Sequence, residues 1–371
     1  MTVVVIVSII ALLLTWLEVK GEIKWGMGWA FVLLTIIEAI HYDFGNDYMP
    51  YLQMYEEITR YPFSLTAILH GDTLKEPGWE ILNYFFVCFG GFFGLVAFIS
   101  IVQNIIYFKF IRRYVTRGWW VMAVFIYLFN SSFYLLNMSM LRQGLAISLF
   151  VLALPYILNR KFIPAIIIIL VAGSFHASAR ILIPFAFFGL LPVEGRAIKI
   201  IAISSFVLLI SLFISQDLLQ GILMRVLDTG DMLDSHGFLD YAETYSQMEN
   251  NVTFGLGYVI GLIPFIVAIC YLLKNDESLV WQRRVACLAL IGTIIIPFTR
   301  IIPLISRVSL YFSVYTICSV PIMYKWISKK SVQYIIVAIY VFMTLYSYYG
   351  FFHGSVYAKY YSTYHTIFSA I

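Results

Sequence analysis

Long runs of apolar residues separated by short polar turns dominate the chain. One crossing of a bilayer takes about 20 apolar residues, so the runs predict an all-α polytopic membrane protein with roughly a dozen transmembrane helices. The pattern leaves no room for a soluble domain, and we expect a single integral-membrane domain over residues 1–371. Several runs are short, which indicates half-helices or kinks. The runs lie near 2–17, 25–41, 79–111, 119–136, 140–158, 162–175, 177–192, 198–215, 254–273, 285–303, 308–324 and 332–351.

Basic residues between the runs predict the orientation of the helices. The positive-inside rule assigns loops rich in Lys and Arg to the cytoplasm. The basic loops are 109–117, 159–161, 194–199, 274–284 and 325–330. Alternate crossings then place the other connections on the outer face. These are 42–78, 137–142, the turn at His176, 216–253, 300–307 and the C-terminal tail.

The run at 79–111 is too long for one straight helix. Two full crossings there would move 42–78 to the wrong face, and the sequence from Phe89 to Phe93 contains two adjacent glycines. Glycines break helices readily, so we expect a break here, with 80–89 as a re-entrant half-helix. With one crossing in this region, we expect both chain ends to lie outside. We also expect the N-terminal run to be a retained helix rather than a signal peptide.

Composition and motifs exclude several classes of function. The chain is 61% hydrophobic and 12% charged, with a mean hydropathy of +0.88, whereas soluble proteins carry about 25% charged residues. The net charge of +4 is scattered over short loops, which argues against nucleic-acid binding. The sequence contains no zinc, Walker or dinucleotide motif. Soluble nucleotide sugars and ATP are therefore unexpected donors, and we expect no metal and no cofactor.

The arginines give the strongest functional signal. Arg142, Arg180, Arg300 and Arg307 lie at the ends of apolar runs, all on the predicted outer face. Arginine near lipid is costly and often marks a site for an anion, so a phosphate-bearing lipid is the expected ligand. Arg142 and Gln143 enter a helix, whose first turn attracts anions. The alternative is that these arginines reach towards lipid phosphate groups as interface anchors.

His176 and Arg180 lie four positions apart at the outer end of a run. On a helix they would share one face, where they could bind phosphate or transfer a proton. A histidine in an apolar span is otherwise a hydrogen-bonded core residue, and both interpretations stay open.

Two carboxylate motifs lie on the predicted outer face. Asp43 and Asp47 flank a glycine turn and can supply a general base or hold an acceptor hydroxyl. Glu76 begins a Glu-Pro-Gly-Trp motif. The alternatives are an Asx turn for the first motif, and helix capping or an interfacial anchor for the second.

Aromatic residues accompany both motifs. Tyr48 and Tyr51 follow Asp47, and Trp79 follows Glu76; their rings offer faces for sugars. The outer loops 42–78 and 216–253 are long for a compact bundle. The second is acidic and either covers a polar ligand or is simply solvated.

In these motifs the chain resembles the EpsG family of bacterial polysaccharide polymerases, which includes many Wzy-type O-antigen and capsule polymerases. The family pattern runs Arg-x-x-x-Gly-Thr-Asp-Tyr-x-x-Tyr, then Glu-Pro-Gly-aromatic, then Arg-Gln-x-x-Ala, then Phe-His with a small residue. His41 stands where the family usually has arginine, and Asn46 replaces threonine. The matching residues are Gly45, Asp47, Tyr48, Tyr51, Glu76, Pro77, Gly78, Trp79, Arg142, Gln143, Ala146, Phe175, His176 and Ser178.

The resemblance implies a membrane glycosyltransferase of the GT-C type that acts on undecaprenyl-diphosphate-linked glycans, both as donor and as acceptor. Its site would face the periplasm from the bacterial cytoplasmic (inner) membrane, and a chain-length regulator is a possible partner. Asp47, Asp43, Glu76 or His176 would deprotonate or orient the acceptor hydroxyl, with Asp47 favoured. Tyr48, Tyr51 and Trp79 would contact sugars. The diphosphates would bind to Arg142, Gln143, Arg180, Arg300 and Arg307.

Three other functions stay open. An O-antigen ligase uses the same carrier lipid, and the sequence does not separate the two acceptors. A flippase for the lipid-linked glycan would place charge at mid-membrane depth and often shows repeat symmetry, whereas here the polar residues gather at one face. A membrane acyltransferase would need a catalytic histidine, for which His176 is a candidate.

Overall fold

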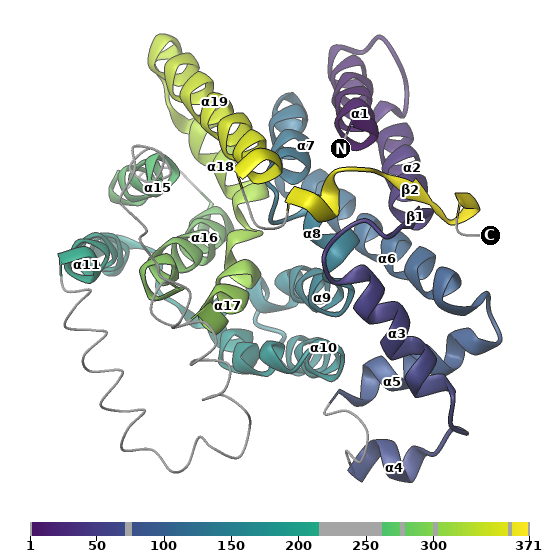
Figure 1. Cartoon of the computed structure of the whole chain (residues 1–371). Coiled ribbons are helices and arrows are strands. Elements are labelled where there is room, and N and C mark those ends of the chain that lie inside the picture. The colour runs from purple at the N-terminus through teal and green to yellow at the C-terminus, as the bar shows by residue number, and fades with distance from the viewer. Residues whose placement is uncertain are drawn as a thin grey trace. The chain divides into compact units, whose positions relative to one another are not determined.

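The computed structural model describes residues 2–70, 76–214, 262–274, 279–299, 303–354 and 358–369. The chain divides into two compact units. The first comprises Met1–Leu191 and Val320–Ile371, and the second Pro192–Ser319. Apart from one pair of very short strands, the regular structure in the described residues is helical (Figure 1). An all-α membrane protein, as predicted from the apolar runs, is confirmed at this level.

The first unit contains most of the elements. In chain order they are α1 (Thr2–Lys20), α2 (Gly26–Ala39), β1 (His41–Tyr42), α3 (Tyr48–Thr59), α4 (Leu65–His70), α5 (Pro77–Val87), α6 (Gly91–Tyr114), η1 (Arg117–Trp119), α7 (Trp120–Phe129), α8 (Tyr134–Ser139), α9 (Leu141–Leu158), α10 (Phe162–Phe175), η2 (Ala177–Leu190), α19 (Lys330–Gly354), η4 (Ala358–Tyr361), β2 (His365–Thr366) and η5 (Ile367–Ser369).

The second unit is helical over its described residues. Its elements are α11 (Gly195–Ile214), α15 (Ile263–Leu273), α16 (Val280–Thr299) and α17 (Pro303–Ser313). The helix α18 (Thr316–Trp326) begins in this unit and continues into the first. The predicted outer loop 216–253 lies outside the described residues.

The predicted break in the run at 79–111 is confirmed. The helix α5 has 11 residues, so it is about 16 Å long and too short to cross a bilayer core of about 30 Å. Gly90 and Gly91 then take φ values of +92° and +64°, which glycine adopts without the steric cost that a side chain adds. The chain thereby turns from α5 into the 24-residue α6. That this helix enters the bilayer as a re-entrant half-helix stays a prediction.

Three other runs are divided or shifted. The run at 119–136 is not one helix, because Asn130 Oδ1 accepts a hydrogen bond from the Ser132 N–H at 3.0 Å and forms a turn between α7 and α8. The run at 177–192 is the 3₁₀ helix η2. The run at 308–324 is bent, because the chain turns by 49° between α17 and α18.

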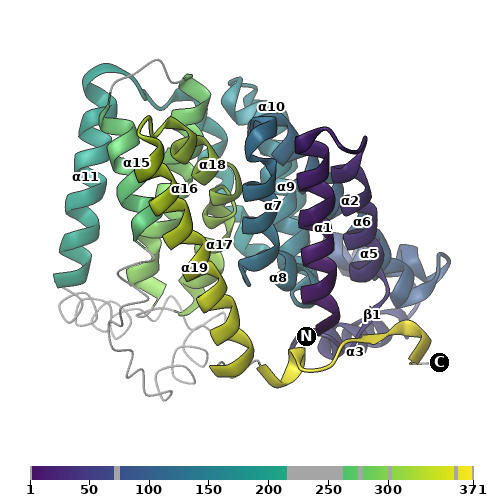
Figure 2. The same ribbon diagram turned by 90° about the horizontal axis from the view of Figure 1, so that it is seen from above.

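The described helices of the first unit have two distinct ends. At one end, Arg112 pairs with Glu18 at 3.7 Å and Arg117 donates a hydrogen bond to the Glu18 carbonyl; we call this the basic end. At the other end lie β1, α3 and the starts of α1, α6 and α9 (Figure 2); we call this the site end. This arrangement agrees with the two faces predicted from charge.

Four of the described helices, α1, α6, α9 and α19, are long and apolar enough to cross a membrane. The bent pair α17 and α18 would make a fifth span if it crosses as one. Shorter apolar helices account for several of the other runs, among them α2, α7, α10, η2 and α15. The protein is therefore a membrane protein, and the roughly twelve crossings stay a prediction.

The C-terminal tail lies at the site end, as the charge pattern predicted. The strand β2 pairs with β1 in antiparallel register, with His41 opposite Thr366. The Gly45 N–H donates to the Tyr360 carbonyl at 3.0 Å, and the rings of Phe44 and Tyr361 lie 5.1 Å apart. The tail thus holds the loop that carries Asp43 and Asp47.

Candidate functional site

The centre of the candidate site is an ion pair between Glu76 and Arg142. Glu76 is the residue before α5 and is buried, with 8% of its surface exposed. Arg142 lies in the first turn of α9. The second carboxylate oxygen of Glu76, Oε1, accepts a hydrogen bond from the Ala177 N–H at 2.8 Å. One carboxylate therefore connects the starts of α5, α9 and η2.

Capping does not explain Glu76, because its side chain makes no hydrogen bond within its own helix end. Pro77 occupies the first helical position, where its missing N–H needs no partner. Gly78 has a different role: a Cβ atom there would lie 2.2 Å from Ser174 Oγ. The Glu-Pro-Gly sequence thus starts α5, directs its carboxylate away from the helix and lets α5 approach α10.

An aromatic ring covers one face of the arginine. The Arg142 guanidinium lies over the Tyr51 ring, 5.3 Å from its centroid, a favourable cation–π arrangement. The Tyr51 ring in turn lies 5.6 Å from that of Trp79. Burial raises the pKa of Tyr51, although the nearby Arg142 acts in the opposite direction, so the phenol stays protonated at neutral pH. The side chain of Arg142 keeps 22% of its surface exposed, which leaves it partly accessible to a ligand.

Asp47 lies near the same tyrosine, since its charge and that of Glu76 both act on the Tyr51 hydroxyl. The Asn46 side chain donates to Asp47 Oδ1 at 2.5 Å. Ser139, at the end of α8, donates to Asn46 Oδ1 at 3.1 Å and accepts from the Asp47 N–H at 3.3 Å. Gly45 has no room for a side chain, because a Cβ atom would lie 2.5 Å from Ser139 Cβ.

Asp43 differs from Asp47 in its surroundings. It is exposed and has a φ of +47°, in the left-handed region that Asp tolerates better than most residues. Asp47 is half-buried and fixed by the contacts of Asn46 and Ser139. The structure therefore separates two carboxylates that the sequence left nearly equivalent.

The predicted helical face shared by His176 and Arg180 is wrong. His176 lies between α10 and η2 in extended backbone, with φ −147° and ψ 117°, so the four-residue spacing does not apply. Its Nδ1 lies 2.7 Å from Ser178 Oγ and 3.3 Å from the Ser178 N–H. The exposed Arg180 turns back and donates from Nε to the Gly173 carbonyl at 3.3 Å. Both residues are nevertheless close in the chain to Ala177, whose N–H donates to Glu76.

His41 is a core residue rather than a ligand-facing one. It is fully buried, and its ring nitrogens face the carbonyl oxygens of Glu38 and Met138, the latter at 2.8 Å. Burial lowers the pKa of His41 to about 4, although the two carbonyls act in the opposite direction. Because protein encloses the ring completely, position 41 is not placed to contact a phosphate.

Several predicted contact residues are covered by protein. Tyr48 and Trp79 are fully buried, and the Tyr48 ring packs 5.4 Å from that of Phe92. Gln143 is also fully buried beside Arg142. Contact of Tyr48 and Trp79 with sugar, and of Gln143 with diphosphate, stays a prediction.

Of the four predicted arginines, the structure describes two in the first unit and one in the second. Arg142 and Arg180 both lie near Ala177 in the first unit. Arg307 belongs to α17 of the second unit, not to a turn as predicted, because the helix starts already at Pro303. Arg300 lies outside the described residues. A common diphosphate site for all four stays a prediction.

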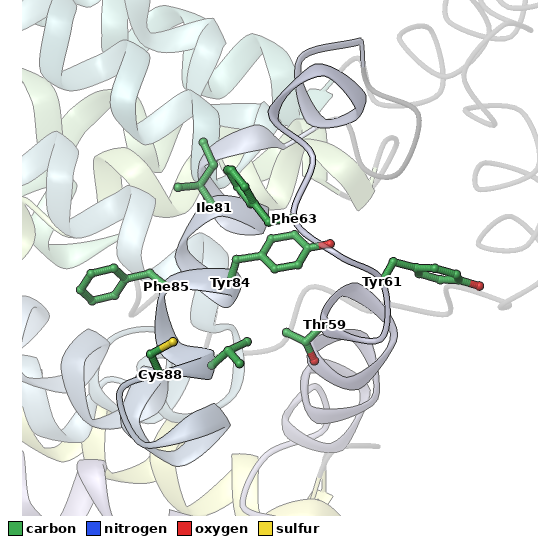
Figure 3. Close-up of a pocket in the computed structure, with 8 residues that line it drawn as sticks. Thr59, Tyr61, Phe63, Ile81, Tyr84, Phe85 and Cys88 are labelled. Carbon is green, nitrogen blue, oxygen red and sulfur yellow. The ribbon is translucent and has the colours of Figure 1, made fainter.

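A pocket of about 500 Å³ lies between the end of α3 and α5 (Figure 3). Aromatic and aliphatic side chains line it, with the rings of Phe63 and Tyr84 5.3 Å apart. Phe85 and Ile81 present large exposed apolar surfaces there, 55% and 41% of their respective totals. The pocket is therefore lined by the helix that starts directly after Glu76, and its walls are mainly apolar.

Two residues at this end of the unit were not predicted from the sequence. Ser139 gave no signal, because serine is unremarkable beside an apolar run. Glu38 did give one, since a carboxylate inside an apolar helix is unusual, and it is fully buried in α2. In the part of the chain that the structure describes, no group of His, Cys, Asp and Glu residues is arranged to hold a metal ion.

Comparison with known proteins agrees with the motifs at the site end. Searches among curated proteins and among solved structures each found no significant match. The sequence pattern of one family does match, over residues 25–366. The matched region begins just before α2 and ends in β2, so it includes every described residue of the site. The chain belongs to the EpsG family.

Proposed function

We propose that the protein is a membrane glycosyltransferase of the GT-C type that polymerises undecaprenyl-diphosphate-linked repeat units into O-antigen or capsular polysaccharide. The reaction would take place at the periplasmic face of the bacterial cytoplasmic membrane. Membership of the EpsG family supports a role in polysaccharide polymerisation. The observation that carries the proposal is the Glu76–Arg142 pair over Tyr51, which places a partly exposed cation at the starts of three helices.

In the proposed reaction, an acceptor hydroxyl oxygen forms a bond to the anomeric carbon of the donor glycan. The bond between that carbon and the diphosphate oxygen breaks, and the diphosphate leaves with the electron pair. The hydroxyl proton passes to a carboxylate. Arg142 and Arg180 stabilise the negative charge that develops on the leaving diphosphate. The step needs no oxidant and no other co-reactant.

We divide the carboxylates between two roles on the basis of their contacts. Both oxygens of Glu76 already accept hydrogen bonds, from Arg142 and from the Ala177 N–H, so we assign Glu76 to positioning Arg142. We assign the acceptor hydroxyl to Asp47, which is half-buried and held by Asn46 and Ser139. His176 is assigned to the phosphate: Nδ1 accepts from the Ser178 N–H, so Nε2 is the ring nitrogen that would donate to a phosphate oxygen.

The apolar pocket between α3 and α5 is assigned to the polyprenyl chain of the substrate. Its walls are aromatic and aliphatic, and α5 starts at Glu76. A carrier lipid whose diphosphate lies near Arg142 can therefore place its hydrocarbon along the same helix. Burial of the chain against these rings would contribute through the hydrophobic effect.

The proposal is tested by the surface polysaccharide ladder of a strain that lacks the gene, restored with wild-type protein, Arg142→Ala or Arg113→Ala. Wild type and Arg113→Ala should restore long polymer, because Arg113 lies at the basic end of α6. Arg142→Ala should leave core with a single repeat unit. Purified protein in vesicles supplied with lipid-linked repeat units should show the same order.

Other results would point elsewhere. A deletion strain that loses every glycan-bearing band would favour a ligase or a flippase, since both act on all lipid-linked glycan. An unchanged ladder with altered acetylation of the sugars would favour acyl transfer. Full-length polymer with Arg142→Ala would remove the arginine from the proposed site.

A further inference from the structure

A carboxylate inside the helix bundle has no part in the chemistry proposed above. Glu38 lies in the last turns of α2 and is fully buried. It belongs neither to the Arg112–Glu18 pair nor to the Arg142–Glu76 pair. An ionisable side chain inside a membrane protein is costly and is commonly retained for function. The side chains around Glu38 show which groups its carboxylate positions.

Two amides from α6 donate hydrogen bonds to the two carboxylate oxygens. Asn104 Nδ2 donates to Oε2 at 2.6 Å. The Gln103 side-chain amide finds a partner at both of its ends in one orientation only. In that orientation Gln103 Nε2 donates to Glu38 Oε1 at 3.0 Å, and Gln103 Oε1 accepts from the Leu145 N–H at 2.9 Å. Glu38 thereby holds a glutamine that contacts the first turns of α9, where Arg142 lies.

Gly144 makes this contact possible. A Cβ atom at this position would lie 2.7 Å from the terminal amide of Gln103 and 3.0 Å from Asn137 Oδ1. The absence of a side chain lets both amides close on α9. Close helix packing therefore explains why a glycine follows Arg142 and Gln143 in the sequence.

The same carboxylate is connected to α8. Asn104 Oδ1 accepts from the Tyr127 hydroxyl at 3.1 Å, and that hydroxyl accepts from Asn137 Nδ2 at 3.2 Å. Asn137 lies two residues before Ser139, which contacts Asp47. The network from Glu38 therefore reaches the supports of both Arg142 and Asp47.

We infer that Glu38 is a positioning residue, whose carboxylate sets the location of Arg142 through Gln103 and of Asp47 through Asn104, Tyr127 and Asn137. The inference rests on the proposed function for its catalytic consequence. A carboxylate is required rather than an amide because two N–H donors converge on it. Glutamine at position 38 would offer one acceptor and one donor, so one N–H would face another.

The hydrogen-bond pattern defines a swap experiment. Glu38→Gln should turn the Gln103 amide and break its bond to Leu145. Gln103→Glu alone would place two carboxylates together. The double variant Glu38→Gln/Gln103→Glu exchanges the two groups and restores every bond. The new amide at position 38 donates to the new carboxylate at position 103 and accepts from Asn104, while the second oxygen of that carboxylate accepts from the Leu145 N–H.

Ser100→Ala is the matched control for these variants. Ser100 is buried on α6, as Gln103 and Asn104 are. Its hydroxyl donates to the Val96 carbonyl of the same helix, so its removal does not touch the contacts of Glu38.

Turnover in vesicles supplied with lipid-linked repeat units is the first measurement. Each single variant should lower kcat per folded molecule roughly tenfold or more while KM changes little, because Arg142 acts on the leaving group. The double variant should recover to within about threefold of wild type, and Ser100→Ala should match wild type. Unchanged kcat in Glu38→Gln, or reduced folded protein with normal kcat, would overturn the inference.

Amide hydrogen exchange over residues 141–146 is the second measurement and needs no activity. Exchange should rise in Glu38→Gln and return to the wild-type rate in the double variant. If wild type makes no polymer but exchange follows this pattern, the proposed function fails and the network stands. If wild type polymerises and exchange is the same in all variants, the network fails and the function stands.

Discussion

Glu76 and Arg142 lie 66 positions apart in the sequence and meet as an ion pair at the site end of the first unit. The pair forms because Pro77 starts α5 immediately after the carboxylate, and because α9 starts one residue before the arginine. Neither charge is fully buried, and the Tyr51 ring covers one face of the guanidinium.

Glu76→Gln and Arg142→Lys should each lower turnover about tenfold or more. Lysine keeps the charge but loses the planar fork and the stacking on Tyr51. If the two side chains act as one unit, the double variant should be no worse than the poorer single variant. Polymer formation by the four proteins checks this. Independent, additive losses would show that the two residues act separately. Arg112→Gln at the basic end is the control variant and should have little effect on polymer formation.

Gly78→Ala should lower the stability of the purified protein by about 1–3 kcal/mol. The new Cβ would lie 2.2 Å from Ser174 Oγ, so α5 and α10 would have to separate. Adding Ser174→Gly should recover part of the loss. Gly118→Ala is the control, because a Cβ there meets nothing within 4 Å. Thermal unfolding in detergent compares these three variants with wild type, and an equal effect of both single alanine variants would contradict the packing argument.

Acidification should destabilise the protein through His41. Its pKa falls from 6.5 to about 4 on burial, so the unfolded chain binds a proton that the folded chain does not. The contribution of this group is complete above pH 6.5 and is lost as the pH falls towards 4. The shift corresponds to about 3 kcal/mol.

Thermal unfolding of wild type and His41→Gln between neutral pH and about pH 4 tests this. The two curves share all other titrating groups, so their difference reports His41. The wild-type protein should lose more stability than the variant on acidification. Parallel curves would mean that His41 does not titrate differently in the folded state.

Tyr361→Ala should destabilise the site end and reduce polymer formation. The Tyr361 ring is buried against Phe44 and Phe351, each 5.1 Å away, and removal of such a ring costs about 3–5 kcal/mol. The loop with Asp47 would then lose its cover. Tyr360→Ala is the matched control: Tyr360 is 41% exposed, and its backbone carbonyl still accepts from Gly45. Protease digestion and polymer length should separate the two variants, and equal behaviour would argue against a role of the tail.

Phe85→Asn should raise the KM for substrates with a long polyprenyl chain and change it little for short-chain analogues. The reason is that Phe85 lines the apolar pocket on α5, where a long chain would bury its hydrocarbon. Ile163→Asn is the control, because Ile163 is 74% exposed on α10 and is not part of the pocket. A rise of KM that is independent of chain length would exclude the pocket as the site of the lipid.

The class of the protein and much of its local structure follow from the amino-acid sequence. Apolar runs predicted the helices, and Gly90 and Gly91 marked the break between α5 and α6. Basic loops and polar motifs separated two ends of the bundle, as observed at Arg112 and at Glu76. These features depend on residues close together in the chain, so composition and spacing are sufficient to predict them.

Which polar groups meet depends on the tertiary structure. Helix packing pairs Glu76 with Arg142, separates His176 from the helical face of Arg180, buries His41 between two carbonyls and connects Glu38 to Leu145 through Gln103. Each of these contacts depends on the packing of helices that are distant in the sequence. Local periodicity carries no information on that packing, because hydrogen bonds and ion pairs are decided by differences of a few ångströms between neighbouring helices.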